Sequence, residues 1–216
     1  MIKRIIKILL LIFVVSLLPV FIYKWINPPF TFIQQSQSEL RGVKGEWLSY
    51  EEIPRDFIIS IIASEDQKFF EHSGFDLEAI ESALEYNKSH KSKRGASTIS
   101  QQTAKNTFCW GSRSWLRKAI ESYYTILIEW VWGKKRIIEV YVNIIEMGRG
   151  TFGIDEAAKY YFKIKGHKLN HSQCVSIVSM LPCPRTCGMN HPLARARQRL
   201  IERAFQGKWV ELPGDF

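Results

Sequence analysis

The sequence lacks the features of several common protein classes. Its 216 residues include only four cysteines, too few for a disulfide scaffold, although an oxidising compartment would permit one bridge. Cys183, Cys187 and His191 have a loosely metal-like spacing, but no fourth ligand is evident, so we do not predict a zinc site. There is no internal repeat, no low-complexity tract and, after residue 53, no sustained strand-like alternation. Helical periodicity dominates instead, which predicts one compact all-α domain.

Acidic residues are also scarce. The chain has 21 Asp and Glu against 30 Lys and Arg, a formal net charge of +9. This excess indicates an anionic partner: nucleic acid, an acidic membrane surface or a phosphorylated substrate. Nucleic acid is the weakest of the three, because the basic residues are spread along a chain that we expect to face outside the cell.

A long apolar run occupies the N-terminus. Residues 8–26 are interrupted only by Ser16, Pro19 and Lys24, and are long enough to span a bilayer, with Tyr23 and Trp25 as interfacial anchors. The basic residues within 1–7 predict a cytoplasmic tail and an external domain. A cleaved signal peptide is the alternative, but residues 27–30 offer no small-x-small cleavage pattern. We therefore expect an uncleaved anchor over 8–26, a linker over 27–49 and a folded domain over 50–216.

Spacing of apolar residues predicts the helices of that domain. We expect them over residues 54–70, 76–89, 97–107, 114–132, 134–145, 153–163, 171–181 and 192–206. Residues 107–116 mix aromatic residues with Gly and Arg and have no period. They fit either a flap at the bilayer interface or a hydrophobic loop packed on the core. Residues 134–143 and 148–158 are interpreted mainly as packing and turn segments.

The stretch 61–76 holds the first candidate for chemistry. Glu65 follows Ile61 and precedes Phe69 by four residues each, so it falls on the apolar stripe of the expected helix. Partial desolvation there raises proton affinity and suits a carboxylate to general-base work. A core-facing glutamate held by a salt bridge or a cap is the alternative. Asp66 beside it, a histidine one turn later and a glycine that would end the helix favour chemistry.

Two further segments could bind an anion. Residues 91–106 form a basic, glycine-containing loop that leads into a helix capped by Ser97 or Thr98, with Lys105 two turns on. Such a helix start offers N–H groups to phosphate, although it is also compatible with an ordinary capped surface helix. Downstream, Arg117 and Glu121 could be a surface ion pair. Alternatively, Glu121 is a second carboxylate that holds a divalent cation or stabilises a leaving group.

Taken together, these segments resemble the catalytic domain of glycosyltransferase family 51, found in class A penicillin-binding proteins and in monofunctional peptidoglycan transglycosylases. The order and spacing agree from about residue 50 to 200. Segment 111–115 resembles the monofunctional enzymes most. The motif residues are Glu65, Asp66, Phe69, His72, Gly74 and Asp76; Gly95, Ser97, Thr98, Ile99, Gln101, Gln102, Lys105 and Asn106; Arg117, Lys118 and Glu121; and Ile137, Glu139, Tyr141 and Asn143.

The resemblance implies a lysozyme-like α domain with a smaller membrane-contacting lobe, preceded by one transmembrane helix. It implies polymerisation of lipid II into glycan strands with inversion of the anomeric configuration. In that reaction Glu65 would act as the base. Glu121 would be a second catalytic carboxylate, which orients the cationic side chains or coordinates Mg²⁺ or Mn²⁺. The implied substrate-binding residues, of which the first three shape the surroundings of the base, are Asp66, Phe69, His72, Ser97, Thr98, Gln101, Gln102, Lys105, Asn106, Arg113 and Lys118.

The implied setting is cell-wall biogenesis and the maintenance of cell shape at the inner membrane, with a periplasmic catalytic domain. Expected partners are lipid II, the growing lipid-linked glycan chain, membrane lipids and proteins of cell-wall synthesis or division.

The sequence departs from the family pattern at two places. Gln173 stands where the family often has Glu, and Cys183 and Cys187 interrupt a usually proline-rich segment. No Ser-x-x-Lys or Lys-Thr-Gly motif is present, so we expect glycosyl transfer without transpeptidation. A glycan-cleaving hydrolase or lytic transglycosylase is the competing enzyme, and an inactive membrane-anchored scaffold is the non-catalytic alternative.

Overall fold

The computed structural model describes residues 2–29, 31, 45–112 and 114–214. It is mostly helical, which confirms the predicted fold class. Its elements in chain order are α1 (Ile2–Trp25), η2 (Tyr50–Glu52), α3 (Arg55–Glu65), α4 (Leu77–Ser89), α5 (Ile99–Phe108), α6 (Trp115–Val131), α7 (Lys134–Ile144), β1 (Glu146–Gly148), β2 (Thr151–Phe152), α8 (Ile154–Phe162), η3 (Gly166–Lys168), α9 (His171–Ser179) and α10 (Pro192–Gly207).

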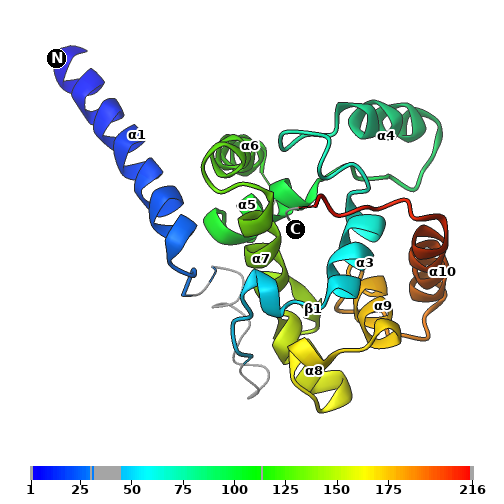
Figure 1. Cartoon of the computed structure of the whole chain (residues 1–216). Helices are drawn as coiled ribbons and strands as arrows, with labels where there is room; N and C mark the ends of the chain where they lie inside the picture. The colour runs from blue at the N-terminus through cyan, green and yellow to red at the C-terminus, as the bar shows by residue number, and fades with distance from the viewer. Residues whose placement is uncertain (1, 30, 32–44, 113, 215–216) are drawn as a thin grey trace.

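Two groups of helices enclose the core (Figure 1). In one group α5 packs against α6 and α7, and in the other α3 packs against α9 and α10. The most buried large side chains come from both groups and include Phe57, Ile61, Ile138 and Tyr141. Helix α4 contributes no buried residue and stands apart from this core (Figure 1).

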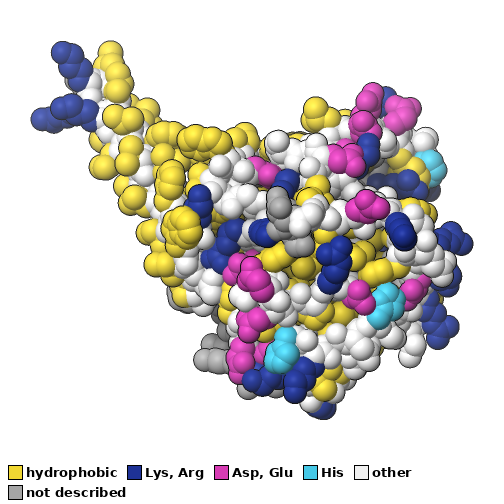
Figure 2. Space-filling view, viewed as in Figure 1, with side chains coloured by type: hydrophobic (Ala, Val, Ile, Leu, Met, Phe, Trp, Pro, Cys, Tyr) yellow, Lys and Arg dark blue, Asp and Glu magenta, His cyan; other side chains and the backbone are white. Residues whose placement is uncertain are grey.

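Helix α1 leaves the domain as a single projecting rod (Figure 1). Hydrophobic side chains cover it, with Lys and Arg at its free end (Figure 2). Its length and hydropathy suffice to cross a membrane. Its second half contacts the domain: Trp132 Nε1 donates to the Val20 carbonyl at 2.7 Å, and the Ser16 and Tyr123 hydroxyls lie 2.8 Å apart.

The expected linker contains residues that the domain holds firmly. Residues 32–44 lie outside the described part of the chain, but residues 46–48 pack against α7 and α8. Asn143 in α7 accepts from the Leu48 amide at 3.0 Å and donates to the Leu48 carbonyl at 2.8 Å. Leu48 itself is 3% exposed. This part of the segment therefore forms one wall of the domain.

The first helix of the domain is shorter than the prediction of 54–70. It ends at Glu65 because Asp66 adopts an extended backbone (φ −163°, ψ 77°) while its side chain binds groups from other segments. Residues 66–73 continue as turns to Gly74, whose φ is +94°. A Cβ at Gly74 would approach the Thr125 side chain to 2.8 Å, so glycine is required there both sterically and conformationally.

The prediction without strands missed one small feature. Strands β1 and β2 form an antiparallel hairpin with Gly150 in its turn at φ +69°. Three- and two-residue strands are too short to produce a recognisable alternation in the sequence. The interpretation of 134–143 as a packing segment is confirmed, because α7 buries Ile137, Ile138 and Val140.

Candidate active site

Glu65, the last residue of α3, lies on the wall of a cleft of about 600 Å³. Its side chain is 13% exposed, and both carboxylate oxygens have partners. Oε1 accepts from Ser64 Oγ at 3.3 Å and from Arg197 Nη1 at 3.2 Å, and Oε2 accepts from Gln102 Nε2 at 3.0 Å. The carboxylate is thus held in one orientation while it borders open space.

Gln102 is fixed in turn from its other end. Its Oε1 accepts from the hydroxyl of Tyr141 at 3.3 Å, and Tyr141 is fully buried. Burial raises the pKa of Tyr141 well above its ordinary value, and the nearby Glu65 and Asp66 carboxylates raise it further. The phenol therefore stays protonated and donates to Gln102 Oε1, which leaves the Gln102 amide nitrogen pointing at Glu65.

The start of α5 is a capping box. Thr98 accepts from the Gln101 amide at 3.1 Å, and the Gln101 side chain accepts from the Thr98 amide at 3.1 Å. Thr98 also donates to the Gly74 carbonyl at 2.7 Å. Both side chains are nearly fully buried, at 3% and 4% exposure. They set the start of the helix, and Thr98 is also among the residues that line the cleft, whereas Gln101 is not.

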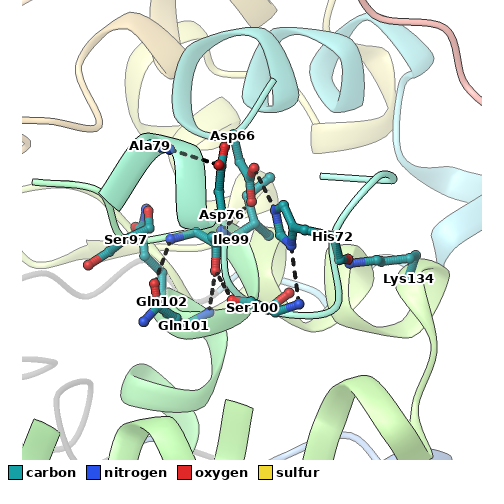
Figure 3. A network of polar contacts seen from close by, with 12 residues as sticks. Asp66, His72, Asp76, Ala79, Ser97, Ile99, Ser100, Gln101, Gln102 and Lys134 are labelled. Atoms are coloured by element: carbon teal, nitrogen blue, oxygen red, sulfur yellow. Dashed lines mark hydrogen bonds and ion pairs between the residues drawn. The ribbon is translucent and has the colours of Figure 1, made fainter. Parts of the chain in front are cut away.

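Asp66 joins the loop after α3 to the start of α5 (Figure 3). Its Oδ2 accepts from the Ile99 amide at 3.0 Å, and its Oδ1 lies 2.9 Å from His72 Nε2. The Gly74 amide donates to His72 Nδ1 at 3.1 Å, so Nε2 carries the proton that bonds Asp66. Phe69 is fully buried, and the Lys134 ammonium lies 4.4 Å from the centroid of its ring. Of the three expected substrate-binding residues in this loop, only Asp66 borders the cleft; Phe69 and His72 support its wall.

A second, smaller pocket of about 270 Å³ carries the positive charge. At its base Glu121 is 2% exposed and accepts from Arg117 Nη1 at 2.7 Å and from Lys118 Nζ at 2.5 Å. Because both carboxylate oxygens of Glu121 are paired, this residue orients the Arg117 and Lys118 side chains toward the pocket. The residues that line the pocket are Ser97, Gln102, Lys105, Trp110, Gly111, Arg117, Lys118 and Glu121.

The two pockets adjoin. Ser97 and Gln102 line both of them, so the carboxylate of Glu65 and the cations of the second pocket open onto one groove. The sequence-predicted residues Glu65, Ser97, Gln102, Lys105, Lys118 and Glu121 are therefore brought together. Asn106 is 7% exposed and its Nδ2 lacks a hydrogen-bond partner among the described residues. Arg113 lies outside the described residues.

Segment 107–116 has a buried part and an exposed part among its described residues. Cys109 is fully buried, whereas Trp115 and Leu116 are 90% and 65% exposed. Phe108 stacks on Tyr124 with ring centroids 4.3 Å apart and on Tyr23 of α1 at 6.1 Å. Phe108, near the start of the segment, therefore lies beside the apolar helix.

Sequence reasoning missed Arg197 and Ser64. Arg197 Nη1 contacts Glu65 Oε1, Ser64 Oγ at 2.8 Å and the Ser64 carbonyl. It comes from α10, whose several arginines look alike in the sequence. Only the three-dimensional packing of α10 on α3 distinguishes this one.

The side chains that the structure describes form no protein-held metal site. Within 2–29, 31, 45–112 and 114–214, no three His, Cys, Asp or Glu side chains are grouped to hold an ion. Glu121, the expected ligand, already has a cation on each oxygen. Cys183 and Cys187 form a disulfide, so neither thiol is available to zinc.

Comparison with known proteins identifies the family. Residues 32–205 match the family model described as Transglycosylase. The chain belongs to this transglycosylase family. Similar proteins named biosynthetic peptidoglycan transglycosylase occur in Bdellovibrio bacteriovorus (45% identity, covering 92% of this chain and 83% of that protein), Shewanella oneidensis (42%, 89% and 85%) and Pseudomonas aeruginosa (41%, 91% and 88%).

The departures from the transglycosylase pattern now have local explanations. Gln173 completes a capping box with Asn170 at the start of α9, accepting from the Asn170 amide at 3.0 Å. The Cys183–Cys187 bridge closes a turn between α9 and α10. Neither feature lines the groove around Glu65.

Proposed function

We propose that this chain is a peptidoglycan glycosyltransferase that polymerises lipid II into glycan strands. The observation that carries the proposal is the single groove in which Glu65 and the cations around Glu121 are joined through Ser97 and Gln102. A transfer that inverts the anomeric carbon needs a base on the attacking side and charge stabilisation on the leaving side. The two ends of this groove supply one each.

In the proposed reaction Glu65 accepts the proton of the 4-hydroxyl of the incoming N-acetylglucosamine. The oxygen then attacks the anomeric carbon of the growing chain, and the bond from that carbon to the undecaprenyl pyrophosphate oxygen breaks. The electron pair of this bond stays on the pyrophosphate. Lys105, Arg117 and Lys118 stabilise the charge there, with Arg117 and Lys118 oriented by Glu121.

The lipid-linked substrates require a site at the membrane. The contacts of α1 with α6 support a domain resting on the bilayer. Helix α6 also exposes a set of large apolar side chains, namely Trp115, Leu116, Ile126 and Trp130. Because Lys3, Arg4 and Lys7 precede the span, we place the N-terminus in the cytoplasm and the catalytic domain in the periplasm, at the inner membrane.

We derive no step of this mechanism through a divalent cation. Mg²⁺ or Mn²⁺ prefers several oxygen ligands, and Glu121 offers oxygens that two cations already occupy. The side chains of the chain therefore supply the positive charge at the leaving group themselves.

The test is polymerisation of labelled lipid II in neutral detergent, with product sizing. Glu65→Gln keeps the shape of the side chain and removes the base, so we expect no polymer, while the exposed Glu71→Gln serves as the matched control. Wild-type turnover in Glu65→Gln would remove Glu65 from the mechanism. Cleavage of finished peptidoglycan without consumption of lipid II would favour a hydrolase or lytic transglycosylase instead.

A further inference from the structure

Helix α10 carries a row of arginines that the proposed reaction does not use. Arg195, Arg199 and Arg203 are spaced four residues apart, so they follow one face of the helix over about 12 Å. All three are exposed. Like charges four residues apart destabilise a helix unless something compensates them.

Within the described part of the chain, no carboxylate lies at ion-pair distance from these groups. Among the described residues, none of the three guanidinium groups forms an ion pair or a side-chain hydrogen bond. Glu202 lies beside them on the helix, but its oxygens are 3.2 and 3.3 Å from His171 Nε2. His171 also contacts Asp56 of α3 at 3.0 Å, so Glu202 is committed to a link between helices.

The row borders a groove of about 540 Å³ between α9 and α10. Ser172 and Ser176 of α9 form part of the opposite wall, and the buried Val175 lies at its floor. Glu202 also lines the groove, with its carboxylate paired to His171. Figure 2 shows Lys and Arg side chains along the edge of the molecule that α10 forms. The groove thus combines a basic rim, hydroxyl groups and a small apolar base.

This groove is separate from both the catalytic cleft and the membrane anchor. Arg197 points from α10 to Glu65, and residues 197 and 199 are about 200° apart around a helix of 3.6 residues per turn. Helix α1 lies on the other side of the domain from α10 (Figure 1). Substrate in the cleft and lipid around α1 are therefore poor candidates for its occupant.

We propose that this groove binds an acidic segment of a partner protein. Guanidinium groups bind carboxylates through two parallel hydrogen bonds, a geometry that the ammonium group of lysine cannot provide. The spacing of the arginines, one at every fourth residue, matches that of carboxylates at every fourth residue of an acidic helix. Such a helix would lie between α9 and α10, in contact with the apolar floor and the serine hydroxyls. Charge complementarity is what selects this occupant.

The probe is a fluorescein-labelled peptide of four Ala-Glu-Ala-Ala repeats, titrated by anisotropy with the full chain in neutral detergent. We expect saturable binding that weakens with salt, and no binding of the peptide with Lys in place of Glu. Arg199→Glu combined with Arg203→Glu should weaken binding about tenfold or more. Arg149→Glu, an exposed arginine outside the groove, should change it by less than about twofold.

Controls separate this proposal from the enzymatic one. Circular dichroism and lipid II polymerisation should be unchanged in the double variant, because Arg199 and Arg203 lie outside the catalytic groove. Equal weakening by Arg149→Glu, or absence of peptide binding to the wild type, would overturn the proposal. So would displacement of the peptide by phosphatidylglycerol micelles of equal charge, since that result assigns the groove to lipid.

Discussion

Arg197 and Glu65, which are 132 residues apart in the chain, form an ion pair with 3.2 Å between Nη1 and Oε1. The same nitrogen donates to Ser64 Oγ and to the Ser64 carbonyl, so Arg197 links α10 to the last turn of α3 by hydrogen bonds. With Gln102 on the other oxygen, the carboxylate is held from two helices. Arg197 is therefore a positioning residue for the proposed base.

Replacing Arg197 by Lys tests this role. Lysine keeps the charge but lacks the planar guanidinium that reaches Ser64 and Glu65 together. We expect lipid II turnover to fall about 10- to 100-fold, because a displacement of about 1 Å at a reacting group costs this much. Thermal unfolding should change little. Arg195→Lys, on the same helix but exposed, is the control, and wild-type turnover in Arg197→Lys would show that the ion pair does not orient Glu65.

The candidate site was predictable where its residues are neighbours in sequence, and not where the fold brings them together. Glu65, Gln102 and Lys105 belong to dense local motifs. No feature of the sequence near Glu65 or Arg197 indicates that these two residues form an ion pair. The same limit explains the helix end at Glu65, because the Ile99 amide that binds Asp66 comes from a segment 33 residues away. Helical spacing alone therefore extended α3 too far.

His171 makes stability depend on pH. Burial lowers the pKa of His171, but hydrogen bonds to the Glu202 and Asp56 carboxylates outweigh this effect and raise the pKa above 6.5. The stabilisation of the fold by protonated His171 is thus fully present below pH 6.5, and it is lost as the pH rises through the folded-state pKa. We expect wild type to exceed His171→Gln in Tm by about 1–3 °C at pH 6, because exposed ion pairs are weak. The difference should shrink by pH 9; a difference that does not vary between these pH values would contradict the assignment.

The four cysteines should react in two classes. Burial, with smaller contributions from nearby carboxylates, raises the pKa of the Cys109 thiol to about 11 and that of the Cys174 thiol to about 12. Both are buried, and the other two form a disulfide. Iodoacetamide should therefore label no cysteine in the native protein, only Cys183 and Cys187 after mild reduction, and all four in denaturant with reductant. Mass spectrometry of tryptic peptides measures this, and labelling of Cys183 without reductant would contradict the bridge.

Asn143→Asp should loosen the segment before η2. The amide of Asn143 donates to the Leu48 carbonyl and accepts from the Leu48 amide, and aspartate cannot donate. Leaving the carbonyl without its donor costs about 1–3 kcal/mol, which lowers Tm by about 2–4 °C per kcal/mol. Asn170→Asp is the matched control, because that side chain caps α9 by accepting from Gln173 and aspartate caps equally well. Equal Tm values for the two variants would refute the proposed pairing.

The docking of α1 on the domain can be measured through Ser16 and Tyr123, whose hydroxyls are 2.8 Å apart. Ser16→Ala, Tyr123→Phe and their combination form a double-mutant cycle, unfolded in neutral detergent. Hydrogen bonds between helices in apolar surroundings give coupling energies of about 0.6 kcal/mol and at most about 1.7 kcal/mol, and we expect a value in this range. The cycle of Ser16→Ala with Tyr124→Phe, the neighbouring tyrosine stacked on Phe108, should give none. Zero coupling between Ser16 and Tyr123 would contradict this hydrogen bond between α1 and α6.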